Sequence, residues 1–157
     1  MSQASMLYLL RHAKAGERLD DTGADRDRPL SKKGLEQAQA IAQYLSNKEV
    51  VTILSSPFQR CIETVQPLSI LSEVEIIKDP VLGEDASIEG LRGIISRYVS
   101  KTTSEIARSS IVICTHGNVV PAIIEIIGLY SNDTIRCAKG SLYEIDLSTR
   151  KISYLEF

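Results

Sequence analysis

Both histidines of the chain follow short apolar runs, and an arginine directly precedes the first of them. His12 follows Arg11 at the end of MLYLLR, and His116 follows the run IVICT. Arg60 comes shortly after a third run, VVTILS. Guanidinium groups offer forked N–H donors that match phosphate oxygens, and imidazole nitrogens add further polar contacts. These residue types indicate a pocket for a phosphate-sized anion.

The three apolar runs have the composition of strands that are buried on both faces of a sheet. They cover residues 6–11, 50–55 and 111–115 and are apolar or β-branched almost throughout. A further short strand is expected at 74–78. The C-terminal residues alternate between apolar and polar types around 148–150, which predicts a hairpin.

Helical periodicity fills most of the chain between these strands. The first helix is expected to begin after Ser31 as its N-cap. Its buried stripe is expected to contain Leu35, Ala38, Ile41, Ala42 and Leu45. Two later helices are expected at 87–104 and 119–129. Residues 17–28 are highly charged and have no apolar period, which predicts a loop.

A helix between the second strand and residue 74 is indicated by a different signal, the pair Ser56-Pro57. Serine is a favoured N-cap and proline is favoured at the first helical position, so the helix is expected to start there. Pro67 is expected to kink this helix or to end it early, because proline removes a hydrogen bond from a helix interior.

The order of strands and helices predicts an α/β fold: a three-layer sandwich with a mostly parallel sheet, helices on both faces and antiparallel edge strands. Ligands bind such sheets at the carboxyl ends of the strands. His12, His116 and Arg60 each follow a predicted strand, so folding is expected to bring them together. Each of these three residues could by itself have a purely structural role, as part of a surface pair, a turn or a helix start. Such separate roles do not explain why all three follow predicted strands.

Composition limits the class of protein. The 157 residues, of which 43% are hydrophobic and 24% are charged, are typical of one globular domain, here assigned to 1–157. A formal charge of −2 is against a general nucleic-acid binder. No apolar segment is long enough to span a membrane and no signal peptide is visible, so a cytoplasmic location is expected.

Cysteine and histidine usage indicates neither disulfides nor a metal site. The three cysteines Cys61, Cys114 and Cys137 are odd in number and widely spaced, with no CxxC pair. The two histidines do not occur in HxH or HExxH patterns, which are typical of metal ligands. We therefore expect reduced thiols, no metal and no cofactor.

Taken in order, three motifs resemble the signature of the histidine phosphatase superfamily, which shares its fold with the cofactor-dependent phosphoglycerate mutases. These motifs are RHA at 11–13, SSPFQRCIET at 55–64 and THGN at 115–118. The segment DRPLSKKGLEQA at 27–38 is also similar to the first helix of that family. The short chain and its RHAKA opening are most similar to SixA-type phosphohistidine phosphatases, and also to the phosphatase half of certain Nudix fusion proteins.

The resemblance implies a phosphoenzyme mechanism, with His12 as the nucleophile. Arg11, Arg60 and His116 then correspond to the rest of the catalytic phosphate pocket. Removing one such donor costs on the order of 3 kcal/mol of transition-state stabilisation. The further residues expected to bind substrate are Lys14, Ser56, Gly117 and Asn118.

The family commonly places a glutamate in an L-x-E pattern after its third strand, and the chain has Leu82-Gly83-Glu84. Glu84 is therefore the candidate general acid, with Asp85 and Glu89 as alternatives and a solvated loop carboxylate as the structural interpretation. Two residues depart from the family pattern. Ala13 stands in place of the more common glycine, and Lys14 adds a cation at the rim.

The short segment between Glu84 and Ile111 leaves room for one helix, which predicts a shallow, open pocket. A phosphohistidine protein is the first expected substrate, and nucleotides or small phosphoesters are the second. Two other functions remain open. One is a phosphoglycerate-type mutase, and the other is a non-catalytic phosphate-binding module that partners a Nudix hydrolase.

Overall fold

The computed structural model describes residues 6–99, 109–129 and 136–157, which form a six-stranded sheet in the order β3-β2-β4-β1-β5-β6. The strands are β1 (Met6–Arg11), β2 (Val50–Ser55), β3 (Ile76–Lys78), β4 (Ser110–Thr115), β5 (Ser141–Asp146) and β6 (Ile152–Glu156). The helices are α1 (Thr22–Arg26), α2 (Lys32–Leu45), α3 (Gln59–Ser72), η1 (Pro80–Leu82), α4 (Ile88–Ile94), η2 (Ile95–Val99) and α5 (Val119–Ile126).

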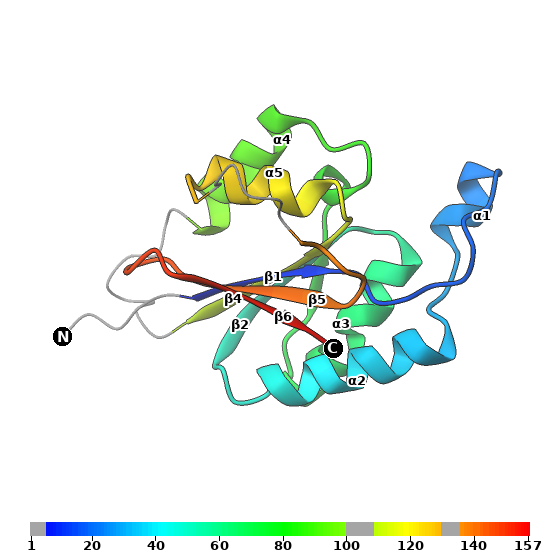
Figure 1. The fold of residues 1–157 in the computed structure, drawn as a ribbon, viewed down its shortest axis with the longest axis horizontal. Helices are drawn as coiled ribbons and strands as arrows, with labels where there is room; N and C mark the ends of the chain where they lie inside the picture. The colour runs from blue at the N-terminus through cyan, green and yellow to red at the C-terminus, as the bar shows by residue number, and fades with distance from the viewer. Residues whose placement is uncertain (1–5, 100–108, 130–135) are drawn as a thin grey trace.

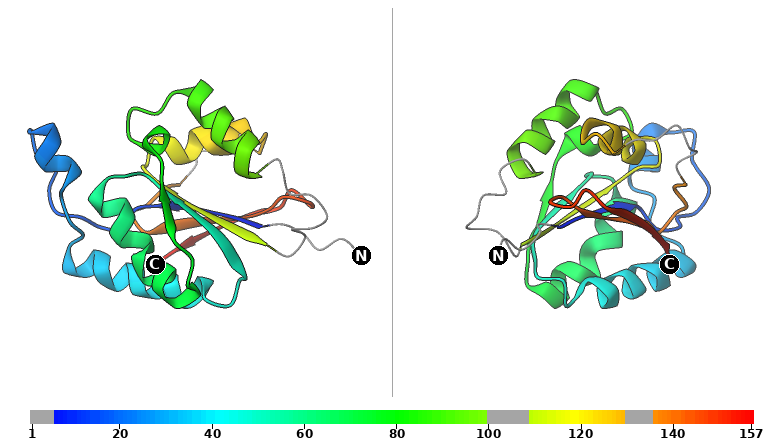
Figure 2. Two further views of the ribbon diagram at one scale, coloured as in Figure 1. Left: turned by 180° about the vertical axis from the view of Figure 1, so that it is seen from behind. Right: turned by 60° about the vertical axis from the view of Figure 1, so that its left-hand side comes forward.

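The sheet lies between two layers of helices, as Figures 1 and 2 show: α2 and α3 cover one face, and α4 and α5 cover the other. Strands β1, β2, β3 and β4 pair in parallel, whereas β5 and β6 add antiparallel strands at one edge. The predicted three-layer fold with antiparallel edge strands is therefore confirmed. The predicted C-terminal hairpin is formed by β5 and β6.

Each face of the sheet has its own apolar core. One cluster packs Leu9, Ile113 and their neighbours against α4 and α5, and the other packs Leu10, Val112 and their neighbours against α2 and α3. Because neighbouring residues of β1 and β4 point to opposite faces, both strands are apolar along nearly their whole length. This burial holds their carboxyl ends in a fixed position.

Helix α2 begins as predicted, because the side chain of Ser31 accepts a hydrogen bond from the amide of Gly34. Leu35, however, is exposed, so its assignment to the buried stripe is wrong. Gly34 and Gln37 are buried in its place, since the helix start is pressed against the chain after β1. A Cβ at Gly34 would lie 1.9 Å from the carbonyl oxygen of Lys14, so only glycine fits there.

Helix α3 departs from its prediction at both proline signals. It begins at Gln59 with Phe58 as the N-cap, so Ser56 is not its N-cap and Pro57 is not its first residue. It also continues through Pro67 to Ser72. An interior proline costs about 3 kcal/mol. Packing of this helix on the sheet, including the fully buried Leu68 directly after Pro67, offsets that cost.

The predicted loop at 17–28 contains a short helix, α1. Its N-cap is Asp21, which accepts a hydrogen bond from Ala24. Helix α4 and η2 follow the predicted helix 87–104 as far as Val99, and the rest of that prediction lies outside the described residues. The predicted strand at 74–78 is shorter than expected and covers Ile76–Lys78.

Candidate active site

A pocket of about 420 Å³ opens at the carboxyl ends of β1 and β4, between the loops that follow them. Four residues expected from the sequence, namely Arg11, His12, Arg60 and His116, all line this pocket. The rings of His12 and His116 are 5.5 Å apart, centroid to centroid. Folding therefore brings together two imidazoles that are more than a hundred residues apart in the chain.

His12 is held by two hydrogen bonds to backbone carbonyl oxygens, one from its main-chain amide and one from its ring. Its amide donates to the carbonyl oxygen of Thr115 at 3.0 Å, which continues the pairing of β1 with β4. Its Nδ1 lies 2.8 Å from the carbonyl oxygen of Ala13. Because a carbonyl oxygen only accepts, Nδ1 carries the proton, and the lone pair of a neutral ring is on Nε2.

The His12 imidazole is neutral at physiological pH. Burial, together with the positive charge of Arg60 and Arg11, lowers the pKa of His12 to about 3, although the hydrogen bond to Ala13 opposes this shift. A neutral imidazole with a free Nε2 is the form that attacks phosphorus. The site therefore keeps His12 in the nucleophilic state without a separate base.

Arg11 is positioned by a close fit against the loop after β4. Its Nη1 donates to the carbonyl oxygen of Cys137 at 2.6 Å, which fixes one side of the guanidinium. A Cβ at Gly117 would lie 2.8 Å from the Arg11 Cζ, so the glycine makes room for this side chain. Gly117 lines the pocket as expected, and its main effect is on the placement of Arg11.

Arg60 is the largest fully buried side chain of the described residues, with 1% of its surface exposed. Its Nη1 donates to the carbonyl oxygen of Asp25 at 2.9 Å and lies 3.5 Å from that residue's carboxylate. Its Nη2 donates to Glu84 Oε1 at 2.6 Å. Two carboxylates thus compensate a charge that would otherwise be costly to bury.

His116 is oriented by Ser56. The Ser56 hydroxyl lies 2.9 Å from His116 Nε2, which leaves Nδ1 to face Glu84 Oε1 at 3.7 Å. Ser56 is fully buried and is absent from the pocket lining, so its expected role in substrate binding is not supported by its position. Its hydroxyl contacts His116 in place of capping the next helix.

Glu84 enters the site, whereas the two alternative acids do not contact its catalytic residues. Oε1 of Glu84 accepts hydrogen bonds from Arg60 and Arg18, and the Asn118 side chain holds the Glu84 carbonyl oxygen at 2.7 Å. Asp85 and Glu89 are both exposed, and neither lines the pocket that contains His12. The position of Glu84 is consistent with a general acid.

The two departures from the family pattern have structural explanations. The Ala13 amide donates to Thr64 Oγ1 at 2.9 Å, so this backbone group is bound within the protein and does not require a glycine. Lys14 is exposed, and neither its side chain nor its backbone lines the pocket. Its backbone amide and carbonyl anchor the start of α2 through Gln37 and Ser31. Its expected role in substrate binding is therefore not supported by its position.

Three cationic residues of the pocket were not anticipated from the sequence: Arg18, Arg28 and Lys139. The first two lie in the charged segment 17–28. The i,i+3 spacing of Asp25 and Arg28 could have indicated a helical turn with an ion pair in this segment. Lys139 precedes β5, and burial together with the positive charge of Arg11 and Arg28 lowers its pKa. The pocket therefore carries an excess of cationic groups in a chain of formal charge −2.

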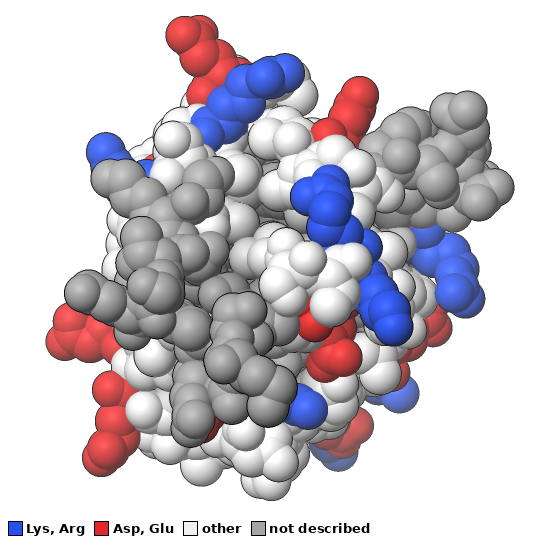
Figure 3. Space-filling view, turned by 90° about the vertical axis from the view of Figure 1, so that its left-hand side faces the viewer, with Lys and Arg blue, Asp and Glu red and all other residues white. Residues whose placement is uncertain are grey.

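This excess is local. The face of the molecule at the amino ends of the strands carries acidic and basic side chains interspersed among uncharged ones, as Figure 3 shows for its described part. No His, Cys, Asp or Glu cluster of the described residues is arranged to hold a metal ion. Within the same residues, no helix has the length and apolar character needed to cross a membrane.

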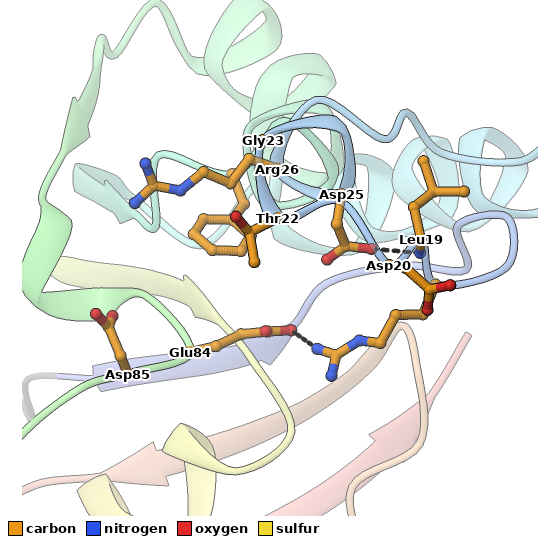
Figure 4. Close-up of a pocket in the computed structure, with 10 residues that line it drawn as sticks. Leu19, Asp20, Thr22, Gly23, Asp25, Arg26, Glu84 and Asp85 are labelled. Atoms are coloured by element: carbon orange, nitrogen blue, oxygen red, sulfur yellow. Dashed lines mark hydrogen bonds and ion pairs between the residues drawn. The ribbon is translucent and has the colours of Figure 1, made fainter.

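A second pocket, of about 610 Å³, adjoins the first and shares Arg18 and Glu84 with it. Figure 4 shows that the segment from Leu19 to Arg26 forms one wall and the loop with Glu84 and Asp85 forms the other. The Glu84–Arg18 ion pair therefore stands at the boundary between the two pockets.

The fold and the site define an α/β protein with a phosphate-sized pocket built from two histidines and two arginines. The family model for the histidine phosphatase superfamily (branch 1) matches residues 7–92 of the chain. The chain belongs to this superfamily.

Among known proteins, the chain is 34% identical over 121 residues to the 8-oxo-(d)GTP phosphatase of Mycolicibacterium smegmatis. This match covers 76% of the chain but only 36% of that relative, so the chain corresponds to about a third of it.

Two solved structures share the fold over nearly the whole chain. The putative phosphohistidine phosphatase SixA from Agrobacterium tumefaciens has a TM-score of 0.76 and 23% identity, with 97% of each chain covered. The protein histidine phosphatase SixA complexed with tungstate has a TM-score of 0.69 and 21% identity, with 96% of this chain and 94% of that chain covered.

Proposed function

We propose that this chain is a phosphatase that acts through a covalent phosphohistidine intermediate on His12. The observation that carries the proposal is the hydrogen bond from His12 Nδ1 to the Ala13 carbonyl oxygen, because it leaves the lone pair on Nε2 of a buried neutral ring. Arg11, Arg60 and His116 line the same pocket. They supply positive charge and N–H donors for the three non-bridging oxygens of a phosphoryl group.

In the first step, the Nε2 lone pair of His12 forms a bond to phosphorus, and the bond from phosphorus to the leaving oxygen or nitrogen breaks. The electron pair stays with the leaving atom, which takes up a proton from the solvent by way of Glu84 as the general acid. The developing charge on the phosphoryl oxygens is held by Arg11 and Arg60. No cofactor or metal is needed for this step, since the two guanidiniums provide the charge.

In the second step, a water molecule attacks phosphorus and gives its proton to the Glu84 carboxylate. The bond between phosphorus and Nε2 breaks, and the ring of His12 recovers its lone pair. Inorganic phosphate leaves, and Glu84 passes the proton from water to the solvent, so that its carboxylate again pairs with Arg60. The two steps together therefore return His12 and Glu84 to the protonation states in which they began.

The substrate that we propose is a phosphohistidine residue of a protein. An imidazole is an easier leaving group than an alkoxide, so it asks less of an acid such as Glu84 that is already bound to two arginines. The exposed residues at the rim of the pocket, among them Gly16, Glu17 and Asn118, leave its mouth open to a bulky partner. The shared fold with SixA structures supports this choice.

A second candidate is the hydrolysis of a nucleotide or other small phosphoester. It is favoured by the 34% identity to an 8-oxo-(d)GTP phosphatase over 121 residues. A mutase and a non-catalytic phosphate-binding module have no comparable observation in their favour. Transfer of the phosphoryl group to an added alcohol in preference to water would identify a mutase.

The test is turnover of p-nitrophenyl phosphate and of a phosphohistidine peptide by the wild-type chain and by His12→Ala. We expect His12→Ala to lower kcat by on the order of 10³-fold or more for both substrates, because the nucleophile is absent. Rapid mixing of the wild-type chain is expected to trap one phosphoryl group per chain in a bond that acid cleaves. Full turnover by His12→Ala, or no turnover by the wild-type chain, contradicts the proposal.

A further inference from the structure

The larger of the two pockets, here called the adjoining pocket, has no role in the proposed mechanism, although it shares Arg18 and Glu84 with the catalytic pocket. His12 lines the catalytic pocket but not the adjoining pocket. In-line transfer places the leaving group on the side of phosphorus opposite to the nucleophile. The candidate acid Glu84 lines both pockets, whereas His12 lines only the catalytic one. A leaving group that Glu84 protonates therefore lies toward this pocket.

The adjoining pocket differs from the catalytic one in charge. Its lining contains two arginines and four carboxylates: Arg18, Arg26, Asp20, Asp25, Glu84 and Asp85. Asp25 and Glu84 already pair with Arg60. Asp20 and Asp85 are exposed and have no basic partner among the described residues. Asp20 lies on one wall of the pocket and Asp85 on the other, as Figure 4 shows. The Arg26 guanidinium in the same lining lies over the Phe58 ring. The two carboxylates outnumber this one cation.

An apolar surface completes the adjoining pocket. Phe58 lines it, with its ring 4.7 Å from that of His116, centroid to centroid. The guanidinium of Arg26 lies 5.2 Å from the same ring. Leu19 adds a second apolar side chain on the wall formed by the loop before α1. Apolar contacts beside free carboxylates suit a ring or methylene group that carries no negative charge.

We infer that the adjoining pocket is a leaving-group subsite that prefers phosphohistidine flanked by basic residues and disfavours leaving groups with negative charge. This inference rests on the proposed function and narrows its substrate class. Lysine or arginine side chains beside the phosphohistidine meet Asp20 and Asp85, whereas a nucleoside phosphate or a glutamate-flanked peptide is repelled by them. The positive charge of the catalytic pocket attracts the phosphoryl group of every substrate. Discrimination between substrates therefore comes from the adjoining pocket.

The experiment compares kcat/KM for two phosphohistidine peptides that differ only in lysine or glutamate residues at the flanking positions. We expect the wild-type chain to prefer the lysine-flanked peptide by about tenfold at low salt, with the difference mainly in KM. The double variant Asp20→Asn, Asp85→Asn is expected to lower this ratio to about twofold. Added salt is expected to lower the ratio for the wild-type chain, because both carboxylates are exposed.

The matched control is Glu75→Gln, Glu125→Gln, which changes the net charge equally. Glu75 precedes β3 and Glu125 is near the carboxyl end of α5, so both lie toward the amino ends of the parallel strands, and both are exposed. This control is expected to keep the wild-type ratio. The inference is overturned if the wild-type chain shows no preference, if it prefers the glutamate-flanked peptide, or if the control lowers the ratio as much as the double variant does.

Turnover of p-nitrophenyl phosphate separates failure of the inference from failure of the proposed function. If the wild-type chain hydrolyses this substrate through His12 but does not discriminate between the peptides, only the subsite is wrong. If it hydrolyses neither this substrate nor a peptide, the proposed function is wrong and the subsite falls with it. A higher kcat/KM for a nucleoside triphosphate than for the lysine-flanked peptide also overturns the subsite.

Discussion

The two pockets share Arg18 and Glu84 but are built from different parts of the fold. The catalytic pocket is made by residues at the ends of buried strands, and His12, Arg60 and His116 are each at most 5% exposed. The adjoining pocket is made mainly by an exposed loop with the short helix α1 and by the loop after η1. Substitutions in the loops therefore change recognition at little cost in stability, whereas changes in the catalytic pocket disturb the core.

The largest difference in kcat is expected between substitutions of two arginines that both lie beside Phe58, Arg60 in the catalytic pocket and Arg26 in the adjoining pocket. The guanidiniums of Arg60 and Arg26 lie 4.9 Å and 5.2 Å from its ring, but only Arg60 is buried. Arg60→Ala is expected to lower kcat by about 10²- to 10³-fold, because a fixed donor to the phosphoryl oxygens is lost. The measurement is steady-state hydrolysis of p-nitrophenyl phosphate.

Arg26→Ala is the matched control, with an expected loss of less than about threefold, since an exposed charge contributes little. Arg60→Ala is also expected to lower the melting temperature, because it leaves Asp25 and Glu84 without their partner. Equal losses of kcat in the two variants would remove the distinction between the pockets.

A smaller effect is expected at Ser56, which contacts His116 but does not line the catalytic pocket. Ser56→Ala removes the hydrogen bond to His116 Nε2, and the ring loses its fixed orientation toward Glu84. We expect kcat to fall about tenfold with KM nearly unchanged, as for the loss of one buried hydrogen bond. Ser55→Ala is the control, since Ser55 is equally buried but its hydroxyl donates to the Ser56 carbonyl oxygen. A rise in KM alone would assign Ser56 to substrate binding.

The burial of His12 in the catalytic pocket is also expected to affect how the free energy of unfolding depends on pH. The pKa of His12 is lowered from 6.5 to about 3 in the folded chain. As pH falls, the imidazole is therefore protonated near pH 6.5 in the unfolded chain but only near pH 3 in the folded chain. The free energy of unfolding therefore falls as pH drops from 6.5 toward 3, with a contribution of up to about 1.4 kcal/mol per pH unit. Urea titrations at pH 7 and pH 5 measure this slope.

His12→Gln is expected to reduce that slope, because the titrating ring is gone from both states. The same slope in the variant and the wild-type chain would show that His12 titrates normally in the folded protein.

The smallest effect on kcat/KM is expected for substitution of Arg18, which lies at the boundary between the two pockets. The Arg18 side chain is 66% exposed and pairs with Glu84. An exposed ion pair contributes between about 0 and 1 kcal/mol, so Arg18→Gln is expected to change kcat/KM for p-nitrophenyl phosphate by less than about threefold. Arg18→Lys serves as the control that keeps the charge. A loss as large as that of Arg60→Ala would place Arg18 in the catalytic pocket proper.

How far the sequence allowed prediction differs between the elements. The strands with Leu9, Ile53 and Ile113 were predictable, because burial on both faces requires nearly continuous apolar residues. The stripe of α2 was predictable except at Leu35, where close approach of the chain at Lys14 shifts the buried face to Gly34. The start of α3 was not predictable, since Ser56 is equally suited to capping a helix and to holding an imidazole.

The sequence by itself determined which residues end the parallel strands, and hence that His12 and His116 meet at one edge of the sheet. Apolar periodicity is a local property of the chain, and parallel pairing converts it into convergence at the carboxyl ends. Only the tertiary structure decided the partners of the charged side chains: Asp25 beneath Arg60, Glu84 between two arginines, and Asp20 and Asp85 facing a pocket of their own. Such pairings depend on the distances between loops remote in sequence, which no periodic pattern encodes.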